Sequence, residues 1–214
     1  IPDVKIKEIL DISNIAKLDS KIIKFMNWVA DYNLIDRGYI LKMILAQEKV
    51  YFSKRENKDT EADNISQPQP ITLNLEQDKA VNKIIKLIKK NDYITLLLDG
   101  IPGSGKTEVY FKVLQNKFFL DSQILILFPE VSLSNEFVRR IEDRFGFSPE
   151  IWHSKINASQ KKNILKRIIS GKAKIIVGAR SALFLPYNNL GMIIIDEEHD
   201  SSFKQEEKGI YHAR

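Results

Sequence analysis

A glycine-rich stretch near the middle of the chain has the residue types and spacing of a phosphate-binding loop. It reads Gly100-Ile101-Pro102-Gly103-Ser104-Gly105-Lys106-Thr107 and matches G-x-x-x-x-G-K-[ST]. Glycines let the backbone wrap around phosphate oxygens, so that several N–H groups and a helix N-terminus point at one anion. In such a loop Lys106 contacts the β- and γ-phosphates of ATP, and the Thr107 hydroxyl binds Mg²⁺. A chance glycine-rich turn is the alternative, but an apolar strand is predicted before the loop and a helix after it.

A second, acidic motif follows an apolar run late in the chain. Residues 193–195 are isoleucines, followed by Asp196, Glu197, Glu198 and His199. An apolar strand that ends in a carboxylate is the Walker B arrangement, in which Asp196 holds Mg²⁺ and Glu197 orients and deprotonates the attacking water. Adjacent carboxylates at a strand end are costly without a cation, and a metal ion explains their presence. The alternatives are an acidic surface loop and, for His199, a surface histidine that makes one hydrogen bond.

The elements that must position these motifs alternate between strands and helices. Apolar runs predict strands at 93–98, 123–128, 150–153, 174–177 and 192–195. Amphipathic patterns predict helices at 76–90, 106–119, 132–145 and 158–170. Continuous apolar strands are typical of a parallel sheet covered on both faces, with ligands at the carboxyl ends of the strands. The predicted fold is therefore α/β, a RecA-like P-loop NTPase lobe over residues 71–214.

Two further regions precede this lobe. Residues 1–54 look mostly helical, and Phe25, Trp28, Val29 and Tyr32 share one helical face. Residues 55–70 are polar, mostly acidic, and end in Gln-Pro-Gln-Pro. Such a stretch cannot bury apolar surface, so we expect a linker between a small helical segment and the lobe.

Composition limits the classes of function. The chain has 214 residues, of which 43% are hydrophobic and 29% charged, as in a globular protein. Without cysteine it forms no disulfide, thiolate metal site or cysteine nucleophile. No apolar run approaches the roughly 20 residues of a membrane span, and no secretory signal is evident, so we expect a cytoplasmic protein without membrane attachment. The net charge of +5 suits a polyanionic partner, although an ordinary lysine-rich protein would share it.

The segment after the acidic motif interleaves aromatic and basic residues. These are Phe203, Lys204, Gln205, Tyr211, His212 and Arg214. Such residues on a loop suit stacking on bases and contact with phosphates, whereas the alternative is a solvated loop whose two aromatic residues pack on their own domain. Arg180 and Ser181 follow the strand predicted at 174–177 and are candidate contacts to the DNA backbone. Pairing of Arg180 with a nearby carboxylate is the alternative there.

The motifs together resemble the primosomal protein N′ (PriA) family of superfamily 2 helicases, and they occur in the order of that family. The similar strings are LEQDKAV at 75–81, GIPGSGKTEVY at 100–110, FPEVSL at 128–133, GARSALFLP at 178–186, LGMIIIDEEHDSSFKQ at 190–205 and YHAR at 211–214. Residues 28–41 resemble the junction after the family's N-terminal DNA-binding domain. The chain departs from the family at Pro102 and Ala179, where threonine is usual, but neither position supplies a phosphate or metal ligand.

The resemblance implies an ATP- and Mg²⁺-dependent 3′–5′ DNA helicase of replication restart. It would act on single-stranded and forked DNA with other primosome or single-strand-binding proteins. Another superfamily 2 translocase subunit, or a DNA-binding module that binds nucleotide without turnover, is the alternative.

The resemblance also assigns individual positions. It places Gln77 where the family reads adenine, and Ser132 at a helix N-terminus that holds a DNA phosphate. It makes the segment 200–214 the aromatic-rich loop that couples DNA binding to hydrolysis. It further implies that the second motor lobe, its arginine finger and the zinc-binding cysteines lie beyond Arg214, so little activity is expected of this chain alone.

Overall fold

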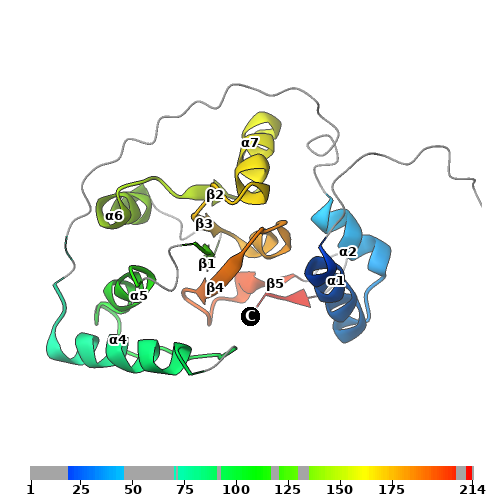
Figure 1. Cartoon of the computed structure of the whole chain (residues 1–214). Helices are drawn as coiled ribbons and strands as arrows, with labels where there is room; N and C mark the ends of the chain where they lie inside the picture. The colour runs from blue at the N-terminus through cyan, green and yellow to red at the C-terminus, as the bar shows by residue number, and fades with distance from the viewer. Residues whose placement is uncertain are drawn as a thin grey trace, which may run out of the picture.

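The computed structural model describes residues 19–45, 70, 72–90, 93–116, 121–129, 135–205 and 211–213 (Figure 1). The helices in these residues are α1 (Ser20–Asn33), α2 (Arg37–Ile44), α4 (Leu75–Ile88), α5 (Lys106–Leu114), α6 (Asn135–Phe145), α7 (Ala158–Ile169) and the short 3-10 helices η2 (Arg180–Phe184) and η3 (Ser201–Phe203). The strands are β1 (Gln123–Leu127), β2 (Glu150–Trp152), β3 (Ile175–Gly178), β4 (Leu190–Ile195), β5 (Lys204–Gln205) and β6 (Tyr211–His212). None of the described helices is long and apolar enough to cross a membrane.

A four-stranded parallel sheet lies at the centre, in the order β2-β3-β1-β4 (Figure 1). Both β1 and β3 are buried along their whole length, as their unbroken apolar sequences predict. The predicted α/β fold with a parallel sheet is confirmed.

Alternate residues of β1 face two separate hydrophobic clusters, because successive side chains of a strand point to opposite sides. Ile124 and Ile126 pack in a cluster with residues of α4, α5 and α6. Leu125 and Leu127 pack in the other cluster, with residues of α7 and η2. The sheet is therefore covered on both faces at its centre, and the two layers of helices hold the carboxyl ends of the strands in fixed positions.

The short helices α1 and α2 belong to the second of these clusters. Their buried residues Val29 and Ile40 lie in the same cluster as Leu125 of the sheet. Phe25 of α1 also contacts Phe184 of η2, with ring centroids 5.8 Å apart. The helical segment thus packs directly on the lobe. Apart from Pro70, the linker expected at 55–70 lies outside the described residues, so the division into domains stays a prediction.

The prediction of a strand at residues 93–98 is wrong. Residues 94–100 have no regular structure, and Tyr93 and Leu97 are 86% and 80% exposed. An apolar run predicts burial, but a strand also needs a neighbour with which to pair, and periodicity does not show whether one is present. Strand β4 pairs only with β1 among the described residues and therefore forms an edge of the sheet. Its Ile193 is 44% exposed, so the expected cover on both faces does not extend to this edge.

The segment after the acidic motif is also more regular than the expected loop. It forms η3 and then a two-stranded antiparallel sheet of β5 and β6, in which Lys204 pairs with His212 and Gln205 with Tyr211. Because neighbouring residues of a strand point to opposite sides, this pairing decides which side chains reach solvent.

Candidate functional site

The predicted phosphate-binding loop lies directly before α5. Gly103 and Gly105 have φ angles of 76° and 80°, a left-handed conformation that residues with a side chain rarely adopt. Gly105 is the N-cap residue of α5 and, being glycine, offers no side chain to the first N–H groups of the helix. These N–H groups need acceptors, and the helix dipole favours an anion at this end, so a phosphate group fits here.

Lys106 already lies beside this loop. Its Nζ donates a hydrogen bond of 2.7 Å to the carbonyl oxygen of Gly100, the first residue of the motif. A carbonyl oxygen is a weaker partner for an ammonium group than a phosphate oxygen is. The side chain can therefore exchange this contact for one with a bound nucleotide.

The first turn of α5 is held in place by ion pairs. Glu108 lies 2.9 Å from Nη2 of Arg140 and 3.3 Å from Nη2 of Arg144, and both arginines belong to α6. These side chains are partly buried, so the pairs are less screened by solvent than surface pairs are. The start of α5, and with it the phosphate-binding loop, is thereby fixed relative to α6.

The acidic motif meets this helix at the end of β4. The Asp196 N–H donates to the carbonyl oxygen of Leu127 at 3.0 Å and so continues the pairing of β4 with β1. The Asp196 carboxylate accepts two hydrogen bonds, one to Oδ1 from the Glu197 N–H at 3.0 Å and one to Oδ2 from the Tyr110 hydroxyl at 2.9 Å. Tyr110 lies on α5, one turn after Lys106. The two motifs, far apart in sequence, therefore form one site.

The contact between Tyr110 and Asp196 is a hydrogen bond to a charged acceptor. Burial raises the pKa of the Tyr110 hydroxyl far above its usual range, and the negative charge of Asp196 raises this pKa further. The hydroxyls of Thr107 and Tyr110 are also neighbours, and their contact acts in the opposite direction on the same pKa. The Tyr110 hydroxyl therefore keeps its proton and lies between Thr107 and Asp196, the two predicted Mg²⁺ ligands.

These residues fit Mg²⁺ bound together with ATP. Magnesium usually takes one or two protein oxygens and completes its octahedron with phosphate oxygens and water. Thr107 and Asp196 offer that number, whereas the described residues contain no group of three or more histidines and carboxylates that could hold a metal by itself. These two residues therefore fit a metal ion that binds together with a nucleotide.

Glu197 differs from its neighbour in both backbone and surroundings. Its φ angle is 51°, which costs energy for a residue with a side chain and is found mainly at turns and functional sites. Its carboxylate is exposed and lies 3.6 Å from Nε2 of His199. Glu197 is thus accessible to a water molecule, while the partly buried Asp196 is held in a fixed orientation.

Gln77 contacts the phosphate-binding loop. Its Oε1 accepts from the Asn74 N–H in a capping box at the start of α4, and its Nε2 donates to the carbonyl oxygen of Ser104, both at 2.9 Å. The amide therefore has partners at both ends in this structure. Recognition of adenine by Gln77 stays a prediction, and it would require these bonds to exchange.

The aromatic residues expected to stack on DNA bases are in the core. Phe203 is 1% exposed and Tyr211 is 3% exposed, and the Tyr211 ring meets Phe184 edge-on at 5.1 Å. A ring without accessible faces cannot stack on a base, so this prediction is wrong for both residues. The physical reason is the large apolar area that these rings remove from water. The alternative, in which the two aromatics pack on their own domain, is what the structure shows.

Arg180 contacts backbone carbonyl oxygens in this structure. It donates from Nη1 to the carbonyl oxygens of Ser202 at 3.0 Å and of Lys204 at 2.6 Å. Neither acceptor is a carboxylate, and both belong to the segment that follows the acidic motif. Arg180 therefore holds that segment in place, and contact with DNA stays a prediction.

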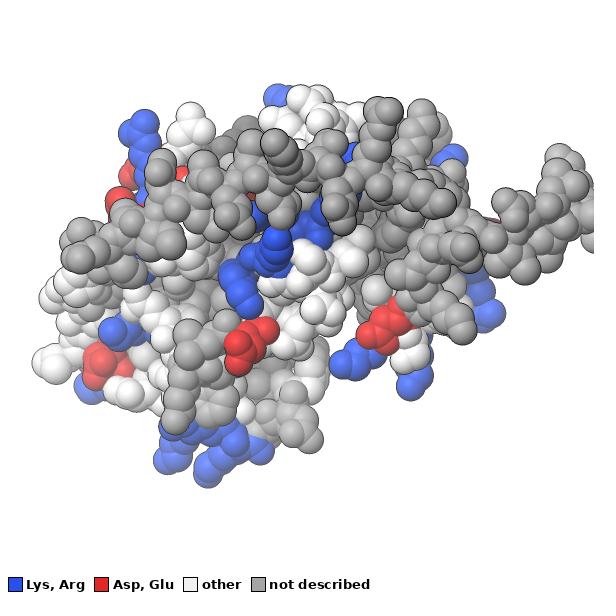
Figure 2. Space-filling view, turned by 45° about the horizontal axis from the view of Figure 1, so that its top comes forward, with Lys and Arg blue, Asp and Glu red and all other residues white. Residues whose placement is uncertain are grey.

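The remaining candidate residues for DNA binding differ in their exposure to solvent. Ser181, Lys204 and His212 are exposed, whereas Gln205 donates to the Tyr39 hydroxyl at 3.2 Å. Ser132 and Arg214 lie outside the described residues. Figure 2 shows lysine and arginine side chains in several separate groups over one face, so the charges visible there do not define a single path for DNA.

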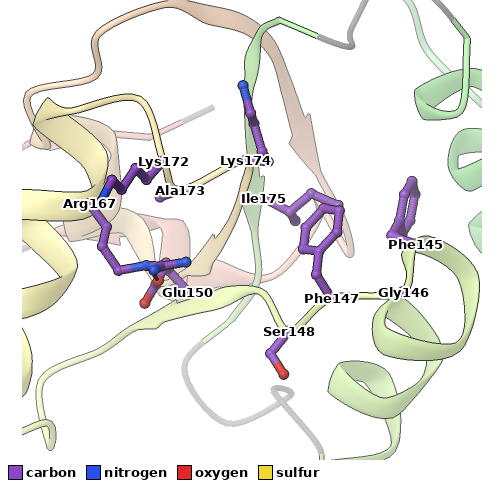
Figure 3. A pocket seen from close by; sticks show the side chains of 10 residues that line it. All are labelled: Phe145, Gly146, Phe147, Ser148, Glu150, Arg167, Lys172, Ala173, Lys174 and Ile175. Carbon is purple, nitrogen blue, oxygen red and sulfur yellow. Dashed lines mark hydrogen bonds and ion pairs between the residues drawn. The ribbon is translucent and has the colours of Figure 1, made fainter. Parts of the chain in front are cut away.

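A cavity of about 230 Å³ lies away from the candidate site (Figure 3). It is lined by Phe147, by the ion pair of Glu150 with Arg167, and by Lys174. Glu150 begins β2 and Lys174 directly precedes β3, whereas Asp196 follows the carboxyl end of β4. Because these strands are parallel, the cavity lies at the opposite end of the sheet from the phosphate-binding loop.

Sequence reasoning missed the role of Tyr110. The signal was its helical spacing, since a residue three positions after Thr107 lies on the same face of α5. The partner on β4 could not be read from this spacing.

A parallel α/β sheet, a glycine-rich loop that starts a helix, and a carboxylate motif at the end of a neighbouring strand define the class of P-loop nucleotide-binding lobes. A family model described as DEAD/DEAH box helicase matches residues 74–213, and the chain belongs to this family.

Curated relatives similar to the chain carry the name replication restart protein PriA. The relative from Rickettsia typhi is 38% identical over 198 residues, which cover 91% of this chain and 29% of the relative. The relative from Bacillus subtilis is 36% identical over 181 residues, covering 85% and 22%, and the one from Haemophilus influenzae is 40% identical over 144 residues, covering 67% and 19%. The chain thus spans less than a third of the length of these relatives.

Proposed function

We propose that the chain binds ATP with Mg²⁺ and serves as the ATP-binding lobe of a 3′–5′ DNA helicase that acts in replication restart. The observation that carries the proposal is the hydrogen bond of 2.9 Å between Tyr110 and Asp196, 86 residues apart. This bond brings the start of the phosphate-binding helix and the acidic motif into one site. The family match and the names of the relatives support the helicase and replication-restart parts of the proposal.

Each residue of the site has a distinct role in this proposal. The backbone N–H groups of residues 103–107 and the Lys106 ammonium bind phosphate oxygens. Thr107 and Asp196 bind Mg²⁺, which, when present with ATP, neutralises the charge that develops on the transferred phosphoryl group. Glu197 accepts a proton from the attacking water, and Gln77 keeps the phosphate-binding loop attached to α4.

Single-stranded and forked DNA are the proposed substrates, with other primosome and single-strand-binding proteins as partners. Arg180 links η2, which carries the exposed Ser181, to the segment of Lys204, and Lys204 pairs with the exposed His212. We therefore expect these three residues to contact DNA phosphates from a common surface. A role in replication restart places the chain in the cytoplasm.

Three measurements with the purified chain test this function. We expect weak binding of single-stranded DNA that declines with added salt, because phosphate contacts release counterions. We expect slow ATP hydrolysis and no unwinding of a forked duplex, because closure of two lobes is what normally completes a motor ATPase and converts hydrolysis into stepping. Glu197→Gln is the control for a contaminating ATPase.

The outcomes separate the candidate functions. DNA-stimulated hydrolysis that Glu197→Gln abolishes would support the helicase lobe. Nucleotide-dependent DNA binding with no hydrolysis would favour a DNA-binding module without turnover. Strand displacement by the chain alone would contradict our view that a second lobe is needed.

A further inference from the structure

Tyr110 connects the two halves of the nucleotide site, and none of the predicted motif roles includes it. Lys106, Thr107 and Tyr110 lie on one face of α5, because positions three and four apart in a helix are neighbours. From this face the Tyr110 hydroxyl reaches Asp196 on the strand side of the site at 2.9 Å. The same hydroxyl also contacts Thr107, so it touches both residues that would hold Mg²⁺.

The ring of Tyr110 is held rigidly. It is 8% exposed and packs edge-on against Phe111, with centroids 5.1 Å apart and an angle of 84° between the rings. Phe111 is itself fully buried. A ring fixed on these sides delivers its hydroxyl to one place, so the geometry of the hydrogen bond to Asp196 is set by the core of the lobe and not by a mobile side chain.

The Asp196 carboxylate accepts a hydrogen bond at each of its two oxygens. Its Oδ1 accepts from the Glu197 N–H at 3.0 Å, and its Oδ2 accepts from Tyr110. Each carboxylate oxygen has more than one acceptor site, so one hydrogen bond to each leaves capacity for a cation or its water ligands. Two donors at opposite oxygens therefore prevent rotation of the carboxylate without blocking it.

We propose that Tyr110 is a positioning residue that holds the Asp196 carboxylate in the orientation in which it binds Mg²⁺ together with ATP. This inference rests on the proposed function as an ATP- and Mg²⁺-binding lobe. Without the hydroxyl, the carboxylate must lose rotational freedom when the metal binds, and that cost weakens binding of the metal. Contacts of the phosphate-binding loop and Lys106 with the nucleotide are unaffected by this loss.

The test is a Mg²⁺ titration of the binding of a fluorescent ATP analogue to the purified chain. Tyr110→Phe keeps the ring and removes only the hydroxyl. We expect the Mg²⁺ concentration for half-maximal binding to rise about two- to tenfold, less than the full contribution of a hydrogen bond to a charged group, because the bond is lost both with and without the metal and only the positioning of the carboxylate differs. Binding of the analogue in EDTA should be the same as in the unmodified chain. Tyr187→Phe is the matched control, since the Tyr187 hydroxyl also donates within the chain, to the Ala182 carbonyl oxygen at 2.8 Å, but lies away from the site.

A double-mutant cycle with Asp196→Asn separates positioning from packing. If Tyr110 acts through the carboxylate, Tyr110→Phe should have little further effect in the Asp196→Asn background. Circular dichroism at increasing temperature selects conditions in which all variants are folded. An unchanged Mg²⁺ requirement in Tyr110→Phe, or an equal effect in both backgrounds, would overturn the inference while leaving the proposed function intact. Failure of the unmodified chain to bind the analogue at any Mg²⁺ concentration would instead reject the proposed function, and this inference with it.

Discussion

The two adjacent carboxylates of the acidic motif have different surroundings, and this difference supports the different roles proposed for them. Asp196 is partly buried and accepts hydrogen bonds at both oxygens. Glu197 is exposed, has a left-handed backbone and lies beside His199. A fixed carboxylate suits a metal ligand, and an accessible one suits proton transfer with water.

Replacement of each carboxylate by its amide should separate the two roles. Glu197→Gln should keep the affinity for ATP and lower hydrolysis by about 10²–10⁴-fold, the contribution of a general base. Asp196→Asn should instead raise the Mg²⁺ concentration needed for binding by about tenfold or more, because a charged ligand is lost. Both constants can be measured by titration with a fluorescent analogue and by phosphate release. Loss of ATP binding in Glu197→Gln but not in Asp196→Asn would show that the roles are reversed.

Local sequence was sufficient to single out the two motifs as candidate sites, because each is a short run whose proposed chemistry depends on adjacent residues. It was not sufficient for Tyr110, whose partner is brought close only by the pairing of β1 with β4. It also failed for Phe203 and Tyr211, since residue type indicates that a ring could stack on a base but not whether its faces are accessible.

At the scale of elements, amphipathic and apolar patterns located most helices and strands to within a few residues. The exception is the run at 93–98, whose sequence is as apolar as that of β1 but which pairs with no strand among the described residues. Strand formation depends on a partner that the run itself does not specify.

One buried side-chain amide at the start of β1 forms hydrogen bonds with three other segments of the fold. The side chain of Gln123 is 1% exposed and makes four hydrogen bonds. Its Nε2 donates to the carbonyl oxygens of Ile168 and Ala173, both at 3.0 Å, and its Oε1 accepts from the N–H groups of Asn188 and Asn189 at 2.7 and 3.0 Å. The end of α7 and the segments before β3 and β4 are all attached to this residue.

Replacement of Gln123 by leucine should therefore destabilise the lobe. The apolar side chain would leave the buried Ala173 carbonyl oxygen without this donor and would remove the acceptor of the Asn188 and Asn189 N–H groups, whereas the Ile168 carbonyl oxygen still accepts from the Gly171 N–H. A buried group left unsatisfied costs about 1–3 kcal/mol. We expect the free energy of unfolding, from urea denaturation followed by circular dichroism, to fall by at least about 2 kcal/mol. Gln160→Leu, at an exposed capping position of α7, is the control and should cost less. Equal stability of Gln123→Leu and the unmodified chain would contradict this account of the amide.

At the scale of the whole molecule, the sequence predicted a helical segment and a lobe but not their contact. Val29 and Ile40 share a hydrophobic cluster with the sheet, so α1 and α2 help to cover one of its faces. The apolar stripe of a helix shows that something covers it, and only the tertiary structure shows what. The net charge of +5 was also insufficient as a guide, because it is consistent with a polyanionic partner but does not show which surface binds that partner.

The central claim is that the phosphate-binding loop and the acidic motif form one site for ATP and Mg²⁺. The most direct measurement is equilibrium binding of a fluorescent ATP analogue to the 214-residue chain and to Lys106→Ala, each with Mg²⁺ and with EDTA. Lys106 contacts the loop at Gly100 and is the only side-chain cation within the motif, so its removal should abolish saturable binding. Saturable binding to the unmodified chain that is strengthened by Mg²⁺ and is lost in Lys106→Ala is the predicted result. Equal affinity of the two proteins, or binding that does not respond to Mg²⁺, would contradict the account.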